Sequence, residues 1–84
     1  MIRDNAKKIV EYMLEKVLLL GDLNEDFIIR YDELTNKLNL ESENHCRVCC
    51  QYLDQLGYAN FIENDNGNRS VRLTAKGIDF LESM

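Results

Sequence analysis

Two strand-like runs near the carboxyl end, YANFIE and SVRLT, enclose the turn sequence NDNGN, and this arrangement most restricts the possible folds. Asn and Gly adopt the positive φ angles that tight turns need, so the segment predicts a β-hairpin. A two-residue turn would place Phe61 opposite Arg72 and mix apolar with polar partners. A three-residue loop, Asp65–Gly67, places Phe61 opposite Val71 instead. We predict this second register, which also pairs Ala59 with Leu73 and leaves Asn60, Ser70 and Arg72 on the outer face.

Three segments before the hairpin and one after it have the spacing of helices. Apolar residues recur every three or four positions from about residue 3 to residue 20, and Gly21 is a natural stop. After a short strand-like run, DFIIR, a second helix begins near residue 31; a third begins after its cap Ser42 and closes at Gly57. Thr74 can cap a last helix over about 75–83. We therefore predict an α+β domain over residues 1–84.

Length, composition and charge narrow the class of protein. A chain of 84 residues with 45% apolar content is expected to form one domain with a modest core. No apolar run approaches the roughly 20 residues of a membrane span, and the first residues carry no signal-peptide pattern, so we expect a cytoplasmic protein without a membrane partner. The net charge of −5 weakens the case for a nucleic-acid partner, although a local basic face could still bind one.

All three cysteines and the single histidine lie in the segment His45–Cys50. On a helix, His45 with Cys49 and Cys46 with Cys50 form two rows rotated by about 100°, and two such rows cannot converge on one metal ion. The cysteines instead share one face with Leu53 and Leu56, where leucine or valine would be usual. We predict buried, reduced thiols, with a metal site and a redox switch as alternatives, and we expect no cofactor and no catalytic centre.

The order helix, short strand, helix, helix, hairpin, helix resembles the winged helix-turn-helix superfamily. YDELTNKLNL is similar to the first helix of its turn motif, CCQYLDQLGY to the end of its recognition helix, and LTAKGIDFLE to the segment after its wing. The likeness covers nearly the whole chain and is nearest to the multiple-antibiotic-resistance and phenolic-acid repressor families. It implies a helix-turn-helix at about 31–57, a wing at about 58–74, and a small transcriptional regulator that binds double-stranded DNA.

The resemblance also implies which side chains face DNA, because the recognition helix and the wing flank the groove. Amides and guanidinium groups can read base edges, and valine can contact a thymine methyl group. The expected DNA-binding residues are Asn44, His45, Arg47, Val48 and Gln51 on the helix, and Arg69 and Arg72 on the hairpin. The alternative is a winged helix that binds a protein and not DNA, which Glu43 on the same face and the acidic balance favour.

Surplus apolar residues predict a second copy of the chain as a partner. The consecutive leucines Leu18–Leu20 span most of the helix circumference, so at least one must point away from the core. In the last helix, Ile78 and Leu81 are expected to pack inward, which leaves other apolar side chains outside that stripe. Two copies would also double the contacts to DNA phosphates. We therefore predict a homodimer whose interface contains Leu18, Leu19, Phe80 and Met84.

Overall fold

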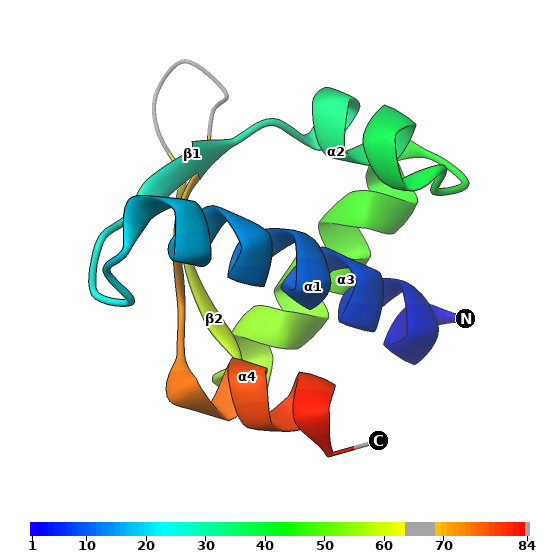
Figure 1. The fold of residues 1–84 in the computed structure, drawn as a ribbon. Helices are drawn as coiled ribbons and strands as arrows, with labels where there is room; N and C mark the ends of the chain where they lie inside the picture. Colours follow the sequence, from blue (N-terminus) through cyan, green and yellow to red (C-terminus); the bar gives the residue numbers. More distant parts are fainter. Residues whose placement is uncertain (64–68, 84) are drawn as a thin grey trace.

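The computed structural model describes residues 1–63 and 69–83. The elements in these residues are α1 (Ile2–Leu20), β1 (Phe27–Ile29), α2 (Tyr31–Leu38), α3 (Glu43–Gln55), β2 (Ala59–Glu63), β3 (Arg69–Leu73) and α4 (Ala75–Glu82), as Figure 1 shows. The predicted α+β class is confirmed, and each helix begins within one residue of its expected start. No helix in these two ranges has the length and the apolar character needed to cross a bilayer.

The strands form one antiparallel sheet in the order β1-β3-β2, so the last strand in the chain lies in the middle. The predicted register of the hairpin is confirmed: Phe61 faces Val71 and Ala59 faces Leu73. The expected loop Asp65–Gly67 lies outside the described residues. The run DFIIR supplies β1, which pairs with the other edge of β3 and sets Ile29 opposite Arg69.

The predicted stops and caps of the helices are confirmed. Gly21 ends α1 at φ 72°, a left-handed conformation that glycine adopts without steric penalty. The Ser42 hydroxyl accepts a hydrogen bond from the backbone N–H of His45 at 3.0 Å and so caps α3. The Thr74 hydroxyl accepts from the Gly77 N–H at 3.2 Å and donates to the Gly57 carbonyl at 2.7 Å. Thr74 thus joins the start of α4 to the turn that follows α3.

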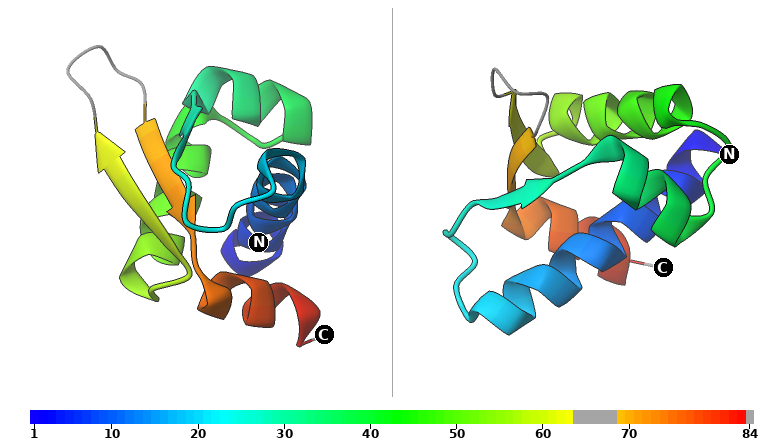
Figure 2. Two further views of the ribbon diagram at one scale, coloured as in Figure 1. Left: turned by 60° about the vertical axis from the view of Figure 1, so that its left-hand side comes forward. Right: turned by 90° about the horizontal axis from the view of Figure 1, so that it is seen from above.

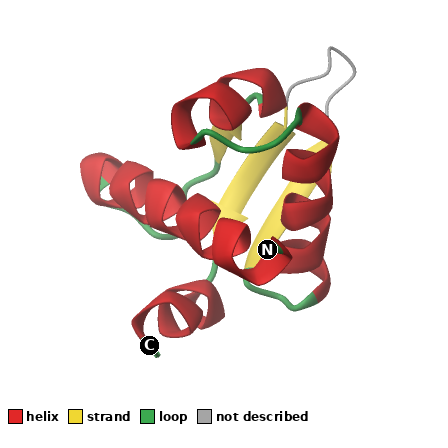
Figure 3. Ribbon diagram, turned by 90° about the vertical axis from the view of Figure 1, so that its right-hand side faces the viewer, coloured by secondary structure: helices red, strands yellow, loops and turns green. Residues whose placement is uncertain are grey.

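Helices cover one face of the sheet, and α1 lies across the inner face with α3 and α4 against it (Figures 2 and 3). Buried side chains from the helices and the sheet form one core, and Ile9, Met13, Leu53 and Leu73 are its largest fully buried members. Cys46, Cys49 and Cys50 are at most 1% exposed, which confirms the prediction of buried thiols. Leu56 was expected on the same face but is 41% exposed, because α3 ends at Gln55 and the chain then turns.

Candidate nucleic-acid interface

The outer side of α3 carries a stripe of polar and apolar side chains. Asn44, Arg47, Val48 and Gln51 are all exposed and follow the three- and four-residue spacing of one helical face, which we call the α3 face. The opposite side of α3 is fixed in the core by its cysteines and Leu53. Rotation of the helix would bury Arg47 and expose thiols, so this face has a fixed direction.

A tyrosine at the start of α2 brings three elements together beside the α3 face. The Arg47 guanidinium carbon lies 5.6 Å from the centre of the Tyr31 ring, and that of Arg69 lies 4.7 Å from it. Cation–π contacts of this kind favour arginine over an aromatic face. A cavity of about 200 Å³, the Tyr31 cavity, adjoins the ring; its lining residues are Tyr31, Cys50, Gln51, Asp54, Phe61 and Arg69.

Tyr31 is protonated in neutral solution at the ordinary pKa of a phenol, and its partial burial reinforces this state. Burial raises the pKa of its phenol, and the neighbouring Arg69 only partly opposes this effect. The phenol therefore stays protonated in neutral solution and can donate a hydrogen bond into the cavity. The cavity thus holds a phenol, an amide and a guanidinium together with the carboxylate of Asp54, so a phosphate or a base edge would compete with that carboxylate for the donors.

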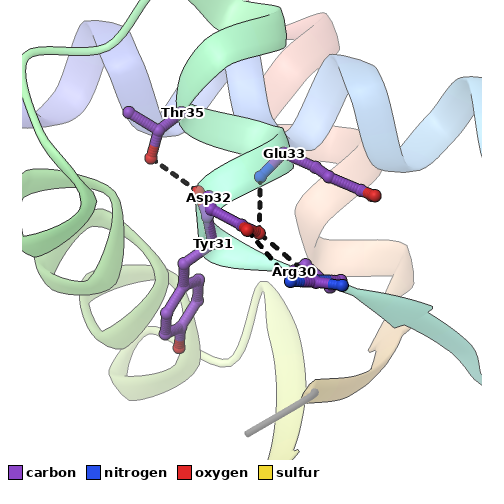
Figure 4. A network of polar contacts seen from close by, with 5 residues as sticks. All are labelled: Arg30, Tyr31, Asp32, Glu33 and Thr35. Carbon is purple, nitrogen blue, oxygen red and sulfur yellow. Dashed lines mark hydrogen bonds and ion pairs between the residues drawn. The ribbon is translucent and has the colours of Figure 1, made fainter.

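The first turn of α2 offsets one of the nearby positive charges. Arg30 Nη2 lies 3.0 Å from Asp32 Oδ2, and the Glu33 backbone N–H donates to Asp32 Oδ1 at 2.8 Å. Figure 4 shows these contacts, with the Tyr31 ring directed away from them. The hydrogen bond from Glu33, followed by the pairing with Arg30, lowers the pKa of Asp32. Asp32 therefore remains ionised, and Arg30 adds little net charge to this edge.

The expected exposure of Arg69 was wrong. Arg69 was expected to face DNA from the hairpin, but its side chain is only 7% exposed and lies against Tyr31. Side chains alternate along a strand, so Arg69 shares the inner side of β3 with Val71 and Leu73. Arg69 contributes a buried charge to the Tyr31 cavity and is not a free arm at the surface.

The expected exposure of His45 was also wrong. Its side chain is 12% exposed, and Asn5 Nδ2 donates to its Nε2 at 2.7 Å. Its Nδ1 lies 3.4 Å from Glu41 Oε2. His45 follows Ser42 at the flank of α3 that α1 covers, so its ring links the two helices and does not face outward.

Arg72 has the predicted exposure but not a free charge. Its side chain is 49% exposed on the outer face of the sheet, where its Nε lies 2.7 Å from Asp26 Oδ1. Asp26 precedes β1, so the pair joins the two strands at their outer side. A duplex phosphate could use Arg72 only in competition with this carboxylate.

Two of the three thiols have the protonation expected of core groups, whereas the pKa of the Cys46 thiol is lowered, chiefly by its hydrogen bond with Cys50. A hydrogen bond with the Cys46 thiol, together with burial, raises the pKa of Cys50, and burial raises the pKa of Cys49. Both thiols therefore stay protonated, and the thiolate is the form that binds metals or attacks disulfides. Within residues 1–63 and 69–83, no three His, Cys, Asp or Glu side chains are grouped as a metal site requires.

The residues predicted for self-association lie in different environments. Leu18 is 72% exposed and Leu19 is 83% exposed, so the expected apolar surface at the end of α1 is present. Phe80 is only 4% exposed and cannot contribute to a surface interface, which corrects that prediction. Its ring packs inward because it stacks on Tyr58, with the ring centres 4.6 Å apart. Met84 lies outside the described residues.

Sequence reasoning missed Tyr31. The residues Tyr31, Leu34 and Leu38 are spaced by three and four positions, so Tyr31 extends the inner stripe of α2 by one turn. This spacing was available in the sequence and would have placed an aromatic ring beside α3.

Comparisons with known proteins found no relative of this chain: no family model matches it, and neither a curated protein nor a solved structure matches it significantly. The α3 face and the Tyr31 cavity therefore carry the inference of function.

Proposed function

We propose that this chain is a winged helix-turn-helix domain that binds double-stranded DNA and acts as a small transcriptional regulator. The order of the elements supports this proposal, because a short strand and two helices precede a β-hairpin whose strand β2 packs beside α3. In this proposal α2 and α3 are the helix-turn-helix, β2 and β3 are the wing, and α3 enters the major groove.

The observation that carries the proposal is the composition of the α3 face. Arg47 can donate two hydrogen bonds to guanine, whereas Asn44 and Gln51 can pair with adenine. Val48 is 47% exposed and could contact a thymine methyl group. These side chains lie at the spacing of one helical face, so they could meet successive base edges together. The Tyr31 cavity lies beside them and offers donors for a backbone phosphate.

Electrostatics limit the affinity that one copy could reach. The chain has a net charge of −5, and acidic residues on α3, Glu43 and Asp54, oppose a duplex. Two arginines near the interface, Arg30 and Arg72, are already paired with carboxylates. One domain would therefore neutralise few phosphates. Its affinity for DNA should be low and should fall steeply as the salt concentration rises.

Replacing Arg47 by alanine is expected to weaken binding to a duplex selected from a random pool. The expected loss is roughly 5- to 150-fold, equivalent to about 1 to 3 kcal/mol, if Arg47 pairs with a guanine. Fluorescence anisotropy between about 50 and 200 mM salt measures the affinity and its salt dependence. Lys8→Ala is the matched control, because it removes one positive charge from an exposed position of α1.

An equal loss in both variants would assign the effect to net charge and not to the α3 face. Failure to select any duplex above non-specific binding would contradict the DNA proposal itself.

A second copy of the chain is the partner that we propose for the end of α1. Leu18 and Leu19 form an exposed apolar surface there, and a symmetric dimer would double the phosphate contacts. Leu19→Glu is expected to weaken self-association by at least about 100-fold, because it buries an unpaired carboxylate in an apolar interface. Sedimentation equilibrium at micromolar concentration measures the mass, with Lys8→Glu as the matched control. A mass of one chain for the unaltered protein would refute the dimer.

A protein partner for the α3 face is the alternative proposal. One observation favours it: a groove of about 410 Å³ beside Val48 is lined by Ile2, Gln51, Tyr52 and Gln55, and none of these side chains is charged. Apolar docking into this groove would change little with salt, whereas DNA binding would weaken steeply. The salt titration described above therefore separates the two proposals.

A further inference from the structure

The sheet has an outer face, and no helix in residues 1–63 and 69–83 covers it (Figures 2 and 3). We call it the outer sheet face; its side chains are Asp26, Ile28, Asn60, Ile62, Ser70 and Arg72. Ile28 is 57% exposed and Ile62 is 59% exposed, so each outer strand presents a branched apolar side chain to water. The outer sheet face is separate from the α3 face and from the leucines at the end of α1. Neither of the contacts proposed above covers it.

Three side chains of the outer sheet face form a row across the strands. Ile28 and Ile62 both pair with Ser70, from β1 on one side and from β2 on the other. Serine is much smaller than isoleucine, so the row is low at its centre. A hollow of about 310 Å³ lies there, lined by Asp26, Asn60, Ile62, Ser70 and Arg72. It has room for an apolar side chain that enters between the two isoleucines.

The next row of the outer sheet face carries one charge of each sign. Arg72 Nε donates to Asp26 Oδ1 at 2.7 Å, and the two side chains are 49% and 40% exposed. A guanidinium has five N–H donors, so Arg72 can keep this contact and also donate to a second carboxylate. A face with a cation beside an anion is complementary to a copy of itself in which the two positions are exchanged.

We propose that the outer sheet face binds the same face of a second copy of this chain. A two-fold axis that runs along the strands, between β1 and β3, places β1 of each copy over β3 of the other. Ile28 then enters the hollow over the partner's Ser70 and lies between the partner's two isoleucines. The same rotation places Asp26 over the partner's Arg72. One symmetry operation therefore fills the hollow and pairs the charges, and this match selects a second copy as the partner.

The sheet contact is expected to be weak. Its three strands have only three, five and five residues, so the contact area is small, and we expect a Kd of about 10 to 100 µM. The contact needs neither DNA nor the leucines of α1. Two different two-fold contacts on one chain can join four copies, so the proposed dimer through α1 should associate further at high concentration.

Sedimentation equilibrium of the Leu19→Glu chain tests the sheet contact alone, because this replacement removes the proposed contact through α1. The mass is expected to be that of one chain at about 1 µM and to approach two chains at about 500 µM. Adding Ile28→Glu should weaken this association by at least about 100-fold, because an acid would enter the apolar hollow. Adding Val48→Glu is the matched control, since Val48 is 47% exposed but lies on α3. One chain at every concentration, or an equal loss in both variants, would overturn the proposal.

A charge exchange tests the predicted pairing between the two copies. In the Leu19→Glu chain, Arg72→Glu leaves two acids on the face and Asp26→Arg leaves two cations, so each variant should self-associate at least about 10-fold more weakly. An equimolar mixture of the two variants should recover the mass of two chains, because their charges are complementary. The exposed ion pair contributes little to stability, so both variants should fold, which circular dichroism checks.

A mixture in which every chain stays single would refute the pairing of Asp26 with the partner's Arg72, and with it the proposed contact. No DNA is present in these measurements, so their outcome is separate from that of the DNA proposal. The Leu19→Glu background likewise separates it from that of the dimer through α1.

Discussion

Replacement of Gly77 by alanine is expected to destabilise the domain by about 3 kcal/mol. A Cβ atom at this position would overlap the backbone carbonyl oxygen of Tyr58 and would lie 2.8 Å from Leu73 Cδ1. Backbone cannot move aside as a flexible side chain can, so α4 would have to shift away from the turn after α3. Helix propensity alone predicts the opposite sign, because alanine is favoured over glycine inside a helix by roughly 1 kcal/mol. Urea denaturation of the purified variant measures the change in the free energy of unfolding.

Gly21→Ala is the matched control for this prediction. Nothing lies within 4 Å of a Cβ atom built on Gly21, but its φ of 72° is unfavourable for alanine. The expected loss is about 1 kcal/mol, which comes from backbone strain alone. A Gly77→Ala variant that is as stable as the unaltered chain, or more stable, would contradict the close packing of α4 on Tyr58.

Replacement of Phe80 by alanine is expected to cost about 3 to 5 kcal/mol of the free energy of unfolding. The ring is 4% exposed and stacks on Tyr58, so its removal leaves a cavity and exposes the side of α1 that packs against α4. Domains of this size are stable by only roughly 4 to 13 kcal/mol, so a large fraction of the stability would be lost. Thermal and urea denaturation, followed by circular dichroism, measure this change.

Leu19→Ala separates this effect from a loss of self-association. Leu19 is 83% exposed, and its truncation is expected to change the stability of the single domain by no more than about 0.5 kcal/mol. If Phe80→Ala lowered the mass in solution and left the unfolding transition of the monomer unchanged, the ring would belong to an interface, contrary to its burial.

The elements of the fold were predictable because local chemistry determines them. Gly21 ends α1, and Ser42 and Thr74 cap the helices that follow them. Each of these residue types by itself favours the backbone geometry that its position needs. The register of β2 and β3 followed from apolar pairing, because a shift by one residue would turn Val71 and Leu73 outward. The α3 face was predictable for a similar reason, since the cysteines determine which side of the helix is buried.

The environments of individual polar side chains were harder to predict. His45 lies at the border of the buried side of α3, and its ring is covered only because Asn5 of α1 contacts it. Ile78 and Leu81 pack against the core as expected, but Phe80 is buried as well, because Gly77 brings its side of α4 close to Tyr58. The burial of Arg69, in contrast, was predictable from the sequence, because side chains alternate along β3 and this places Arg69 with Val71 and Leu73 on the inner side.

The position of β3 in the middle of the sheet has a consequence during synthesis of the chain. Both other strands pair with β3 and not with each other, so a nascent chain that ends before residue 69 can form no part of this sheet. Strands β1 and β2, which contain Ile29 and Ala59, therefore have no pairing partner until the ribosome has added β3. Pairing of β1 with β3 is slow, because the long stretch of chain between them must close into a loop first, whereas β2 and β3 are neighbours in the chain. The three helices made earlier must hold the emerging chain together until the last strand is complete, so we expect the domain to fold in one late step.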